Sequence, residues 1–327
     1  MDQFDDSSIL ITGGTGSIGQ SLTSLLLEKS KARRIVIFSR DELKQYEMKG
    51  RLGNSDRLRW FLGDIRDLDR MRLALTNVDY VIHAAALKQV DTGEFNPSEF
   101  IKTNISGSQN VIQAAIDRGV KKVVALSTDK ASSPINLYGA TKLTADKLFV
   151  AANNYGAAQG TAFSVVRYGN VLGSRGSVMP FFKNLGDSTG RIPITDFAMT
   201  RFWITLKQAS RFVLESFEVM QGGELFVPRI PSMKITDFAE AICPGAELYE
   251  IGLRPGEKLH EEMISKEDSF RAILSPDQSR FTICPNFASW PFIQPNGNLA
   301  IKGKSYSSDG NDLWLTKDSL LELINND

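Results

Sequence analysis

The segment ITGGTGSIG, residues 11–19, constrains the fold of this chain more than any other feature. It follows a short apolar run at residues 7–12 and opens a segment with helical periodicity at residues 16–29. Glycines at this spacing permit a tight turn, close approach of phosphates and close packing of helix on strand. The helix that follows directs its free N–H groups and positive dipole end to the same place. This context predicts a dinucleotide-binding loop made of Gly13, Thr15, Gly16, Ser17, Ile18 and Gly19.

Apolar runs alternate with helix-like segments through the first half of the chain. Five further runs are typical of buried strands: residues 34–39, 58–63, 79–85, 121–127 and 162–170. Helical segments at residues 97–119 and 138–156 lie between the later runs. Such alternation predicts an α/β fold, a Rossmann-like doubly wound parallel sheet covered on both faces.

The rhythm changes after residue 170, where glycine, proline and short strand-like runs replace the regular repeat. We therefore expect a nucleotide-binding domain in residues 1–170, to which the chain returns at about residues 205–230. Residues 171–327 are expected to form mainly a smaller C-terminal substrate-binding lobe. The last fifty residues are polar and irregular and end in a short helix.

Charge and composition exclude several classes of function. The 38 basic and 38 acidic residues cancel, so no bulk field attracts nucleic acid or a membrane surface. The two cysteines, Cys243 and Cys284, have no disulfide or metal-ligand spacing, so we expect reduced thiols, a cytoplasmic location and no metal site. His83 lies inside an apolar run and is expected to be a hydrogen-bonded core residue.

The residues after the second strand bear on which dinucleotide binds. Ser39 and Arg40 stand where an acidic residue would select NAD, and Arg40 with Lys44 suits the 2′-phosphate of NADP. Asp41 leaves the choice open, because it is either a displaced ribose ligand or the N-cap of the next helix. Residues after the third and fourth strands, Asp64, Ile65 and the small Ala84, complete the expected cofactor contacts.

Tyr138 and Lys142 are four residues apart and share one face of a helix. A lysine ammonium beside the phenol would lower the pKa of Tyr138, and Lys142 could also hold the nicotinamide ribose. Thr128, at the end of the fifth strand, could hydrogen-bond the reacting oxygen. With these motifs (TGGTGSIG, GDIRD, HAAA, STDK and YGATK) the chain resembles the extended short-chain dehydrogenase/reductase superfamily.

Asp129 and Lys130 add an acid and a base that a simple dehydrogenase does not need. They suit an elimination, in which a base removes the proton from C5 of a 4-keto sugar and an acid expels the C6 hydroxyl as water. Here the chain closely resembles the inverting UDP-N-acetylglucosamine (UDP-GlcNAc) 4,6-dehydratases of pseudaminic acid-type pathways. That resemblance runs from SRDELKQYEM to GLRPGEKLHEEMI. It implies UDP-GlcNAc as substrate, Lys130 as C5 base, Asp129 as acid, with the two roles left interchangeable, and a homo-oligomer, a dimer or larger.

The same resemblance implies substrate contacts from Lys88, which also borders the cofactor, and from Asn170, Ser174, Arg201 and Arg254. Residues 306–308 are expected to close the site from the tail. The segment 89–91 reads Gln-Val-Asp where the family commonly has His-Val-Pro, so the shape of that loop is open. A nucleotide-sugar 4-epimerase, a 4,6-dehydratase of another nucleotide sugar and a non-enzymatic NADP-binding module remain as alternatives.

Overall fold

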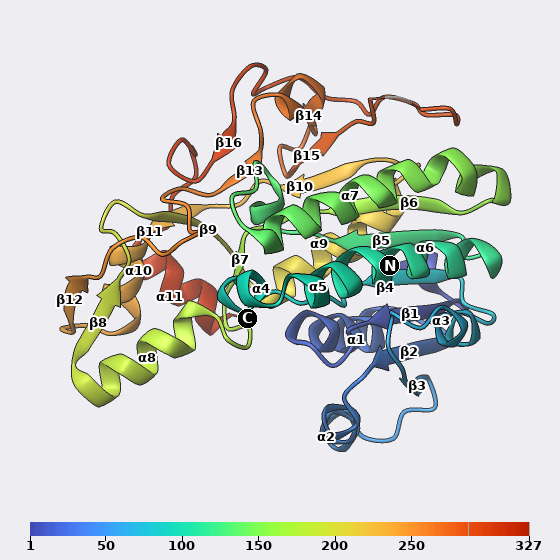
Figure 1. Cartoon of the computed structure of the whole chain (residues 1–327), viewed down its shortest axis with the longest axis horizontal. Coiled ribbons are helices and arrows are strands. Elements are labelled where there is room, and N and C mark those ends of the chain that lie inside the picture. The colour runs from blue at the N-terminus through green and yellow to red at the C-terminus, as the bar shows by residue number, and fades with distance from the viewer. Residues whose placement is uncertain (287, 327) are drawn as a thin grey trace.

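The computed structural model describes residues 1–286 and 288–326, and its largest element is a nine-stranded sheet (Figure 1). Seven strands are parallel, in the spatial order 10-6-5-4-1-2-3. Their bounds are β10 (Leu225–Pro228), β6 (Ala162–Val166), β5 (Lys122–Leu126), β4 (Tyr80–His83), β1 (Ser8–Thr12), β2 (Arg34–Ser39) and β3 (Leu58–Leu62). The predicted Rossmann-like sheet is confirmed, and the order reverses between β1 and β4, where such sheets bind ligands.

Helices cover both faces of this sheet. On one face α1 (Ser17–Lys29) packs beside α9 (Leu206–Val219). On the other, α3 (Leu68–Ala74), α6 (Gly107–Asp117) and α7 (Leu137–Gly156) lie side by side. The strands between them are apolar on both faces: Ile9, Leu10 and Ile11 of β1 are all fully buried. Burial on two sides is what continuous apolar runs in the sequence predict.

Two antiparallel strands extend the sheet beyond β10, and the sequence did not reveal them. β15 (Arg280–Ile283) pairs with β10, and β14 (Ala272–Leu274) pairs with β15. The expectation that the last fifty residues are irregular is therefore wrong for β15, and both strands return to the main sheet. Runs of three and four residues are too short to show the hydrophobic periodicity of a strand. Their strand conformation depends on the strand with which they pair rather than on local sequence pattern.

A separate group of elements forms a lobe beside the carboxyl ends of the parallel strands (Figure 1). Its parts are β7 (Asn170–Val171), α8 (Val178–Thr189), β8 (Arg191–Ile194), β9 (Thr200–Ile204), β11 (Ser232–Lys234), α10 (Ile235–Ile242), β12 (Glu247–Glu250) and α11 (Lys317–Asn325). A second apolar core holds the lobe together, centred on Trp203, which stacks on Phe238 with ring centroids 4.1 Å apart. The antiparallel pair β13 (Glu262–Ile264) and β16 (Tyr306–Ser307) adjoins this lobe and contributes to the core of the main sheet. No described helix has the length and apolar character needed to cross a membrane.

The predicted helix at residues 97–119 is interrupted. A short α5 (Pro97–Phe100) passes into a π-helical turn (Ile101–Ser106) before α6 begins. Within this turn Asn104 is buried, and its amide bonds both the N–H and the C=O of Leu87, each at 2.9 Å. π-turns often mark functional sites. This one fixes the backbone after β4, next to Lys88.

The short α2 (Glu42–Leu52) and α4 (Val90–Phe95) complete the helices around the nucleotide half. Asp41 is the N-cap of α2, and its carboxylate accepts a hydrogen bond from the backbone N–H of Lys44 at 2.9 Å. Of the two interpretations of Asp41, the structure therefore supports the cap. Since an N-cap aspartate is held by the helix, it is a poor choice for a ribose ligand.

Candidate active site

A cavity of about 1060 Å³ lies at the carboxyl ends of the parallel strands, between the sheet and the lobe. This volume is at the upper end for a single-ligand site. The structure brings nearly all the sequence-predicted residues to its wall: Gly13, Thr15, Gly16, Ser17, Ile18, Ser39, Arg40, Lys44, Asp64, Ile65, Ala84, Lys88, Thr128, Asp129, Lys130, Tyr138, Lys142, Asn170, Ser174, Arg201 and Arg254. Gly19 is the exception. It packs behind the wall, where a Cβ would lie 2.6 Å from Gly14.

The glycine loop fits a dinucleotide. Gly13 has a φ of +64°, and a Cβ there would come within 2.9 Å of the backbone of Ala85 at the end of β4. Gly16 is the N-cap of α1 and provides no side chain to cap it. The first-turn N–H groups of α1 therefore remain available for phosphate oxygens.

The tip of β2 carries a half-exposed positive charge. The Arg40 side chain is 50% exposed and lies 3.5 Å from the carboxylate of Asp64, which is a loose ion pair. Lys44 is instead engaged at 2.7 Å by Asp41. Of the two cations predicted to meet a 2′-phosphate, Arg40 is the better placed to turn toward one.

Tyr138 projects from the first turn of α7, which Asn136 caps by accepting from the N–H of Gly139 at 2.8 Å. Burial raises the pKa of Tyr138 to about 12, against the opposing effects of the Lys130 ammonium and a hydrogen bond with Thr128. The sequence-based expectation that Lys142 lowers this pKa is wrong for the free protein. The Lys142 ammonium is buried and donates to the C=O of Leu126 at 2.7 Å.

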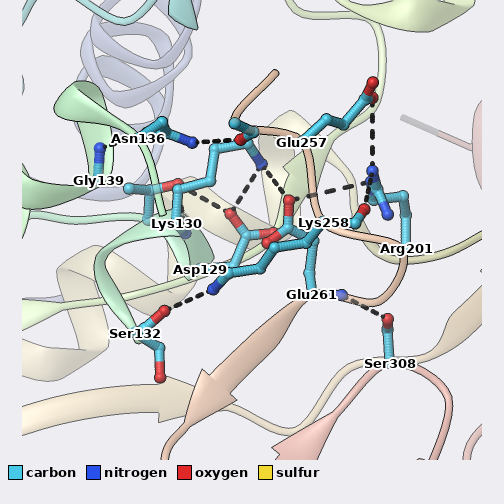
Figure 2. A network of polar contacts seen from close by, with 12 residues as sticks. Asp129, Lys130, Ser132, Asn136, Gly139, Arg201, Glu257, Lys258, Glu261 and Ser308 are labelled. Atoms are coloured by element: carbon cyan, nitrogen blue, oxygen red, sulfur yellow. Dashed lines mark hydrogen bonds and ion pairs between the residues drawn. The ribbon is translucent and has the colours of Figure 1, made fainter. Parts of the chain in front are cut away.

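Asp129 and Lys130 lie in a short 3-10 turn after β5 and meet a third charged residue that the sequence did not single out (Figure 2). The Lys130 Nζ is 3.2 Å from Asp129 Oδ1 and 2.8 Å from Glu261 Oε1. Both carboxylates are almost completely buried. The fold thus brings two acids and one amine together, although Asp129 and Glu261 are 132 residues apart in the sequence.

The charges of this cluster determine its protonation. Burial works to lower the pKa of Lys130, but the two carboxylates outweigh it and raise that pKa, so the amine is an ammonium at neutral pH. Burial raises the pKa of Asp129, which favours its protonated form. Burial has the same tendency at Glu261, yet Lys130 and Arg201 together lower the pKa of that carboxyl. The free protein therefore holds the Lys130 ammonium between two buried carboxyl groups, of which Asp129 is the more readily protonated.

Buried polar atoms without a hydrogen-bond partner gather at this cavity. Among the described residues eight such side-chain atoms occur, and six belong to residues of the cavity wall. These six are Thr103 Oγ1, Asp129 Oδ2, Ser177 Oγ, Trp203 Nε1, Glu257 Oε2 and Glu261 Oε2. Since buried polar groups are normally satisfied, their concentration here indicates a site built for a polar ligand.

Two predicted substrate ligands differ in availability. Arg201 lines the cavity but is buried, and its guanidinium donates to the C=O groups of Thr200, Leu259 and Lys258 at 2.7–3.0 Å. It therefore braces the wall and has few donors left for a diphosphate. Arg254 is exposed on the same wall and suits that role better.

The tail residues predicted to close the site do not line it. Tyr306 is buried, and its hydroxyl exchanges hydrogen bonds with the backbone of Ile230. Ser308 is fully buried and accepts a hydrogen bond from the N–H of Glu261 at 3.0 Å. The tail acts from behind the wall, so the expected direct closure is wrong.

His83 matches its prediction as a core residue. Its ring nitrogens lie 2.8 Å from Thr12 Oγ1 and 3.2 Å from Ser108 Oγ, and burial lowers its pKa to about 3. No group of histidine, cysteine or acidic side chains suited to a metal ion occurs in the described parts of the chain. The chemistry available in the cavity is therefore that of Tyr138, Lys130 and the two carboxylates, together with whatever ligand binds there.

Comparison with protein families adds a decisive observation. Residues 9–282 match the model of a family described as polysaccharide biosynthesis protein. The chain belongs to this family. Across 98% of both chains it is 53% identical to a protein of Campylobacter jejuni named UDP-N-acetylglucosamine 4,6-dehydratase (inverting). The resemblance to this group of dehydratases is confirmed by that relative and by a second one from another strain of the same species at 52% identity.

Other proteins similar to this chain have different names. A UDP-glucose 4-epimerase of Rickettsia canadensis is 42% identical over 82% of this chain. The solved structure of Pen from Bacillus thuringiensis aligns with 99% of both chains at 39% identity and a TM-score of 0.87. The structure of DesIV from Streptomyces venezuelae, a dTDP-glucose 4,6-dehydratase, aligns with 77% of this chain at 24% identity and a TM-score of 0.69, a likeness of fold.

The comparisons do not single out individual side chains, and sequence reasoning overlooked several that line the cavity. Glu261 is the most important, followed by Glu257, Thr103, Ser177 and Trp203. Glu257, Glu261 and Glu262 stand within six residues in the sequence GEKLHEE, and no local pattern distinguishes the one that faces Lys130. Glu261 is brought to face Lys130 by the pairing of β13 with the tail strand β16.

Proposed function

We propose that this chain is a UDP-GlcNAc 4,6-dehydratase that inverts C5, a lyase whose product is UDP-2-acetamido-2,6-dideoxy-arabino-hex-4-ulose. The observation that carries the proposal is 53% identity over 98% of the chain to a relative of that name. The cavity supports it chemically, since Tyr138, Asp129 and Lys130 line one wall. A redox residue and an acid–base pair in one cavity are what an oxidation followed by an elimination requires.

The cofactor half of the cavity fits a nicotinamide dinucleotide, because the glycine loop and the uncapped N-terminus of α1 form a cradle for its phosphates. When bound, the nicotinamide would take a hydride from sugar C4 and later return it to C6. Tyr138 would accept the proton of the C4 hydroxyl, with Thr128 beside it holding the same oxygen. Lys142, anchored on the end of β5, would contact the nicotinamide ribose.

The elimination would follow at the Asp129–Lys130 pair. Once C4 is a ketone, the Lys130 ammonium would pass a proton to Asp129, 3.2 Å away, which gives a neutral amine and a protonated acid. The amine would remove the C5 proton, and the electron pair of that C–H bond would pass into the enolate of the ketone. Protonated Asp129 would then give its proton to the departing C6 hydroxyl, which leaves as water. The raised pKa of Asp129 suits this role as acid. With hydride returned to C6, C5 would take a proton from solvent on the opposite face, which inverts that carbon.

A nucleotide-sugar 4-epimerase is the second candidate, favoured by the Rickettsia relatives of that name at 42–43% identity. An epimerase needs only hydride transfer and Tyr138, and it leaves the C6 hydroxyl in place. The buried Asp129–Lys130–Glu261 cluster has no task in that reaction. Burying these charged groups costs desolvation free energy, and only the dehydratase reaction gives them a function, so the cluster favours the dehydratase.

Product analysis distinguishes the two candidates. Protein supplied with NADP and UDP-GlcNAc in heavy water should give a 4-keto-6-deoxy sugar nucleotide by NMR, with deuterium at C5 and an inverted C5 centre. An epimerase would give a C4 epimer that retains its C6 hydroxyl and its C5 proton. Unchanged UDP-GlcNAc, alongside turnover of another nucleotide sugar, would reject the substrate and keep the reaction class.

We propose NADP rather than NAD as the bound cofactor, on the basis of the half-exposed Arg40. Replacing Arg40 with Ala should weaken NADP binding by about 10- to 100-fold, as expected when a charge-assisted hydrogen bond to a phosphate is lost. NAD binding should change little and serves as the internal control. Isothermal titration of both cofactors measures the ratio, and an equal loss for NAD and NADP would contradict the assignment.

A further inference from the structure

We propose that Glu261 is a positioning residue of the dehydration: it fixes the Lys130 nitrogen beside Asp129 and determines the charge of that nitrogen during proton transfer at C5. The inference rests on the proposed function and assigns a role to a residue outside the recognised Asp129–Lys130 pair. Its basis is the shortest ion pair of the cluster, 2.8 Å between Lys130 Nζ and Glu261 Oε1 (Figure 2).

Glu261 is supported through both its backbone and its carboxylate. Its N–H donates to Ser308 Oγ, and that hydroxyl also lies 2.7 Å from Thr200 Oγ1 of β9. Arg201, on the same strand, brings its Nε to 4.0 Å from the carboxylate. The tail thus anchors the backbone of Glu261, while Lys130 and Arg201 contact its carboxylate, and the residue is 2% exposed. Such support is expected for a group that must hold a partner to within a fraction of an ångström.

A purely structural ion pair elsewhere in the protein provides a contrast. Arg167 and Asp146 are both buried, 3.0 Å apart, and the Asp146 oxygen that meets Arg167 also accepts from Ser127. Neither residue lines the cavity. Glu261 and Asp129 do line it, and each leaves one buried carboxylate oxygen without a partner. Buried acids with free oxygens at a cavity are costly for stability, which points to a role in chemistry.

The electrostatic effect on Lys130 follows from the groups that face it. Asp129 adjoins it on the same turn, Glu261 precedes β13, and Arg201 comes from β9, while Lys258 lies on the loop before Glu261. In the free protein, the carboxylates of Asp129 and Glu261 raise the pKa of Lys130 more than the nearby cations lower it, so the nitrogen is protonated. Removing the charge of Glu261 leaves Arg201 and Lys258 in place, so the Lys130 ammonium should lose its proton at lower pH.

Glu261→Gln tests this, with Glu262→Gln as the matched control. Glu262 carries the same charge one residue away but bonds Ser132 and Ser133 instead of Lys130. With the NADP-loaded protein and UDP-GlcNAc, the rate of C5 deuterium exchange should rise with pH to a plateau as Lys130 loses its proton. The midpoint of this rise, called the limb below, should lie at least about 1 pH unit lower in Glu261→Gln than in the wild type. The rate at the plateau should fall while KM changes by less than about threefold, because no substrate contact is removed. Glu262→Gln should keep the wild-type limb.

Glu261→Asp tests whether charge is the determinant. It keeps the carboxylate and withdraws it by one methylene, so we expect a lower rate with the limb close to that of the wild type. The inference is overturned if Glu261→Gln keeps the wild-type limb, or if Glu261→Asp shifts as far as Glu261→Gln.

An NMR titration makes the test independent of catalysis. The Lys130 side-chain signal of ¹³C-lysine protein, assigned by its loss in Lys130→Arg, should titrate at lower pH in Glu261→Gln than in the wild type. If wild-type protein fails to convert UDP-GlcNAc, the proposed function is rejected, while this titration still decides whether Glu261 controls Lys130. An identical Lys130 titration in both proteins would reject the pairing.

Discussion

Replacing Lys130 with Arg should abolish dehydration while leaving oxidation at C4 intact. Arginine keeps a positive charge between Asp129 and Glu261 but cannot lose its proton at any accessible pH. It therefore preserves the electrostatics of the cluster and removes the base. We expect C5 deuterium exchange and water loss to fall by at least about 10³-fold, within the range attributed to general-base catalysis. Reduced nicotinamide, followed by its fluorescence, should still form with UDP-GlcNAc and then persist.

The choice of arginine over a neutral residue matters for Tyr138 as well as for folding. A neutral side chain would remove the cation nearest to the buried carboxyl groups of Asp129 and Glu261, at a cost of about 3–5 kcal/mol. It would also remove the ammonium that opposes the rise in the pKa of Tyr138. Dehydration by Lys130→Arg at the wild-type rate would show that another group takes the C5 proton.

The nucleotide-binding half could be predicted from sequence because its signals are local. The strand bounded by residues 34–39 was located to the residue, and the glycine loop, the uncapped α1 and the α7 face follow from spacing alone. In a parallel sheet with apolar strands, each apolar run in the sequence is a buried strand and each helical segment is a helix that covers the sheet, so the order of elements along the chain indicates their arrangement. That is why residues as distant as Gly13 and Tyr138 could be assigned to one cavity before the structure was known.

The acid–base cluster could be predicted only in part, because one of its three residues is brought in by tertiary pairing. Asp129 and Lys130 are adjacent in the sequence, whereas Glu261 reaches them through β13 and its antiparallel partner in the tail. The protonation states of the site depend on the same tertiary contacts, which the sequence does not show. Spacing suggested that Lys142 acts on the phenol, but burial and the position of Lys130 govern its pKa instead. Spacing gives proximity along a helix and carries no information on desolvation.

Replacing Tyr138 with Phe should stop the reaction one step earlier than Lys130→Arg does. The substitution removes the hydroxyl and leaves the ring, so α7 and the cavity wall should keep their structure. Without an acceptor for the C4 hydroxyl proton, we expect the rate of C4 oxidation to fall by about 10²- to 10⁴-fold. Reduced nicotinamide and C5 exchange should then appear with UDP-GlcNAc only at this residual rate.

The pH dependence of the wild type provides a second signature of this residue. Tyr138 acts as a base only as phenolate, and its pKa of about 12 in the free protein leaves it almost fully protonated at neutral pH. Single-turnover oxidation of C4 should therefore accelerate as the pH rises, until the phenol of the loaded protein is titrated. Lys130→Arg should keep this rise, since the neighbouring positive charge is retained. In Tyr138→Phe the residual rate should be independent of pH over the same range.

A 4-keto substrate separates the two halves of the site within one variant. When the 4-keto sugar nucleotide is supplied directly, Tyr138→Phe should still exchange the C5 proton with solvent, because Asp129, Lys130 and Glu261 are unchanged. Lys130→Arg should fail on the same compound. If Tyr138→Phe fails as well, the phenol itself takes part in proton transfer at C5. The separation of a redox tyrosine from an eliminating lysine would then be wrong for this cavity.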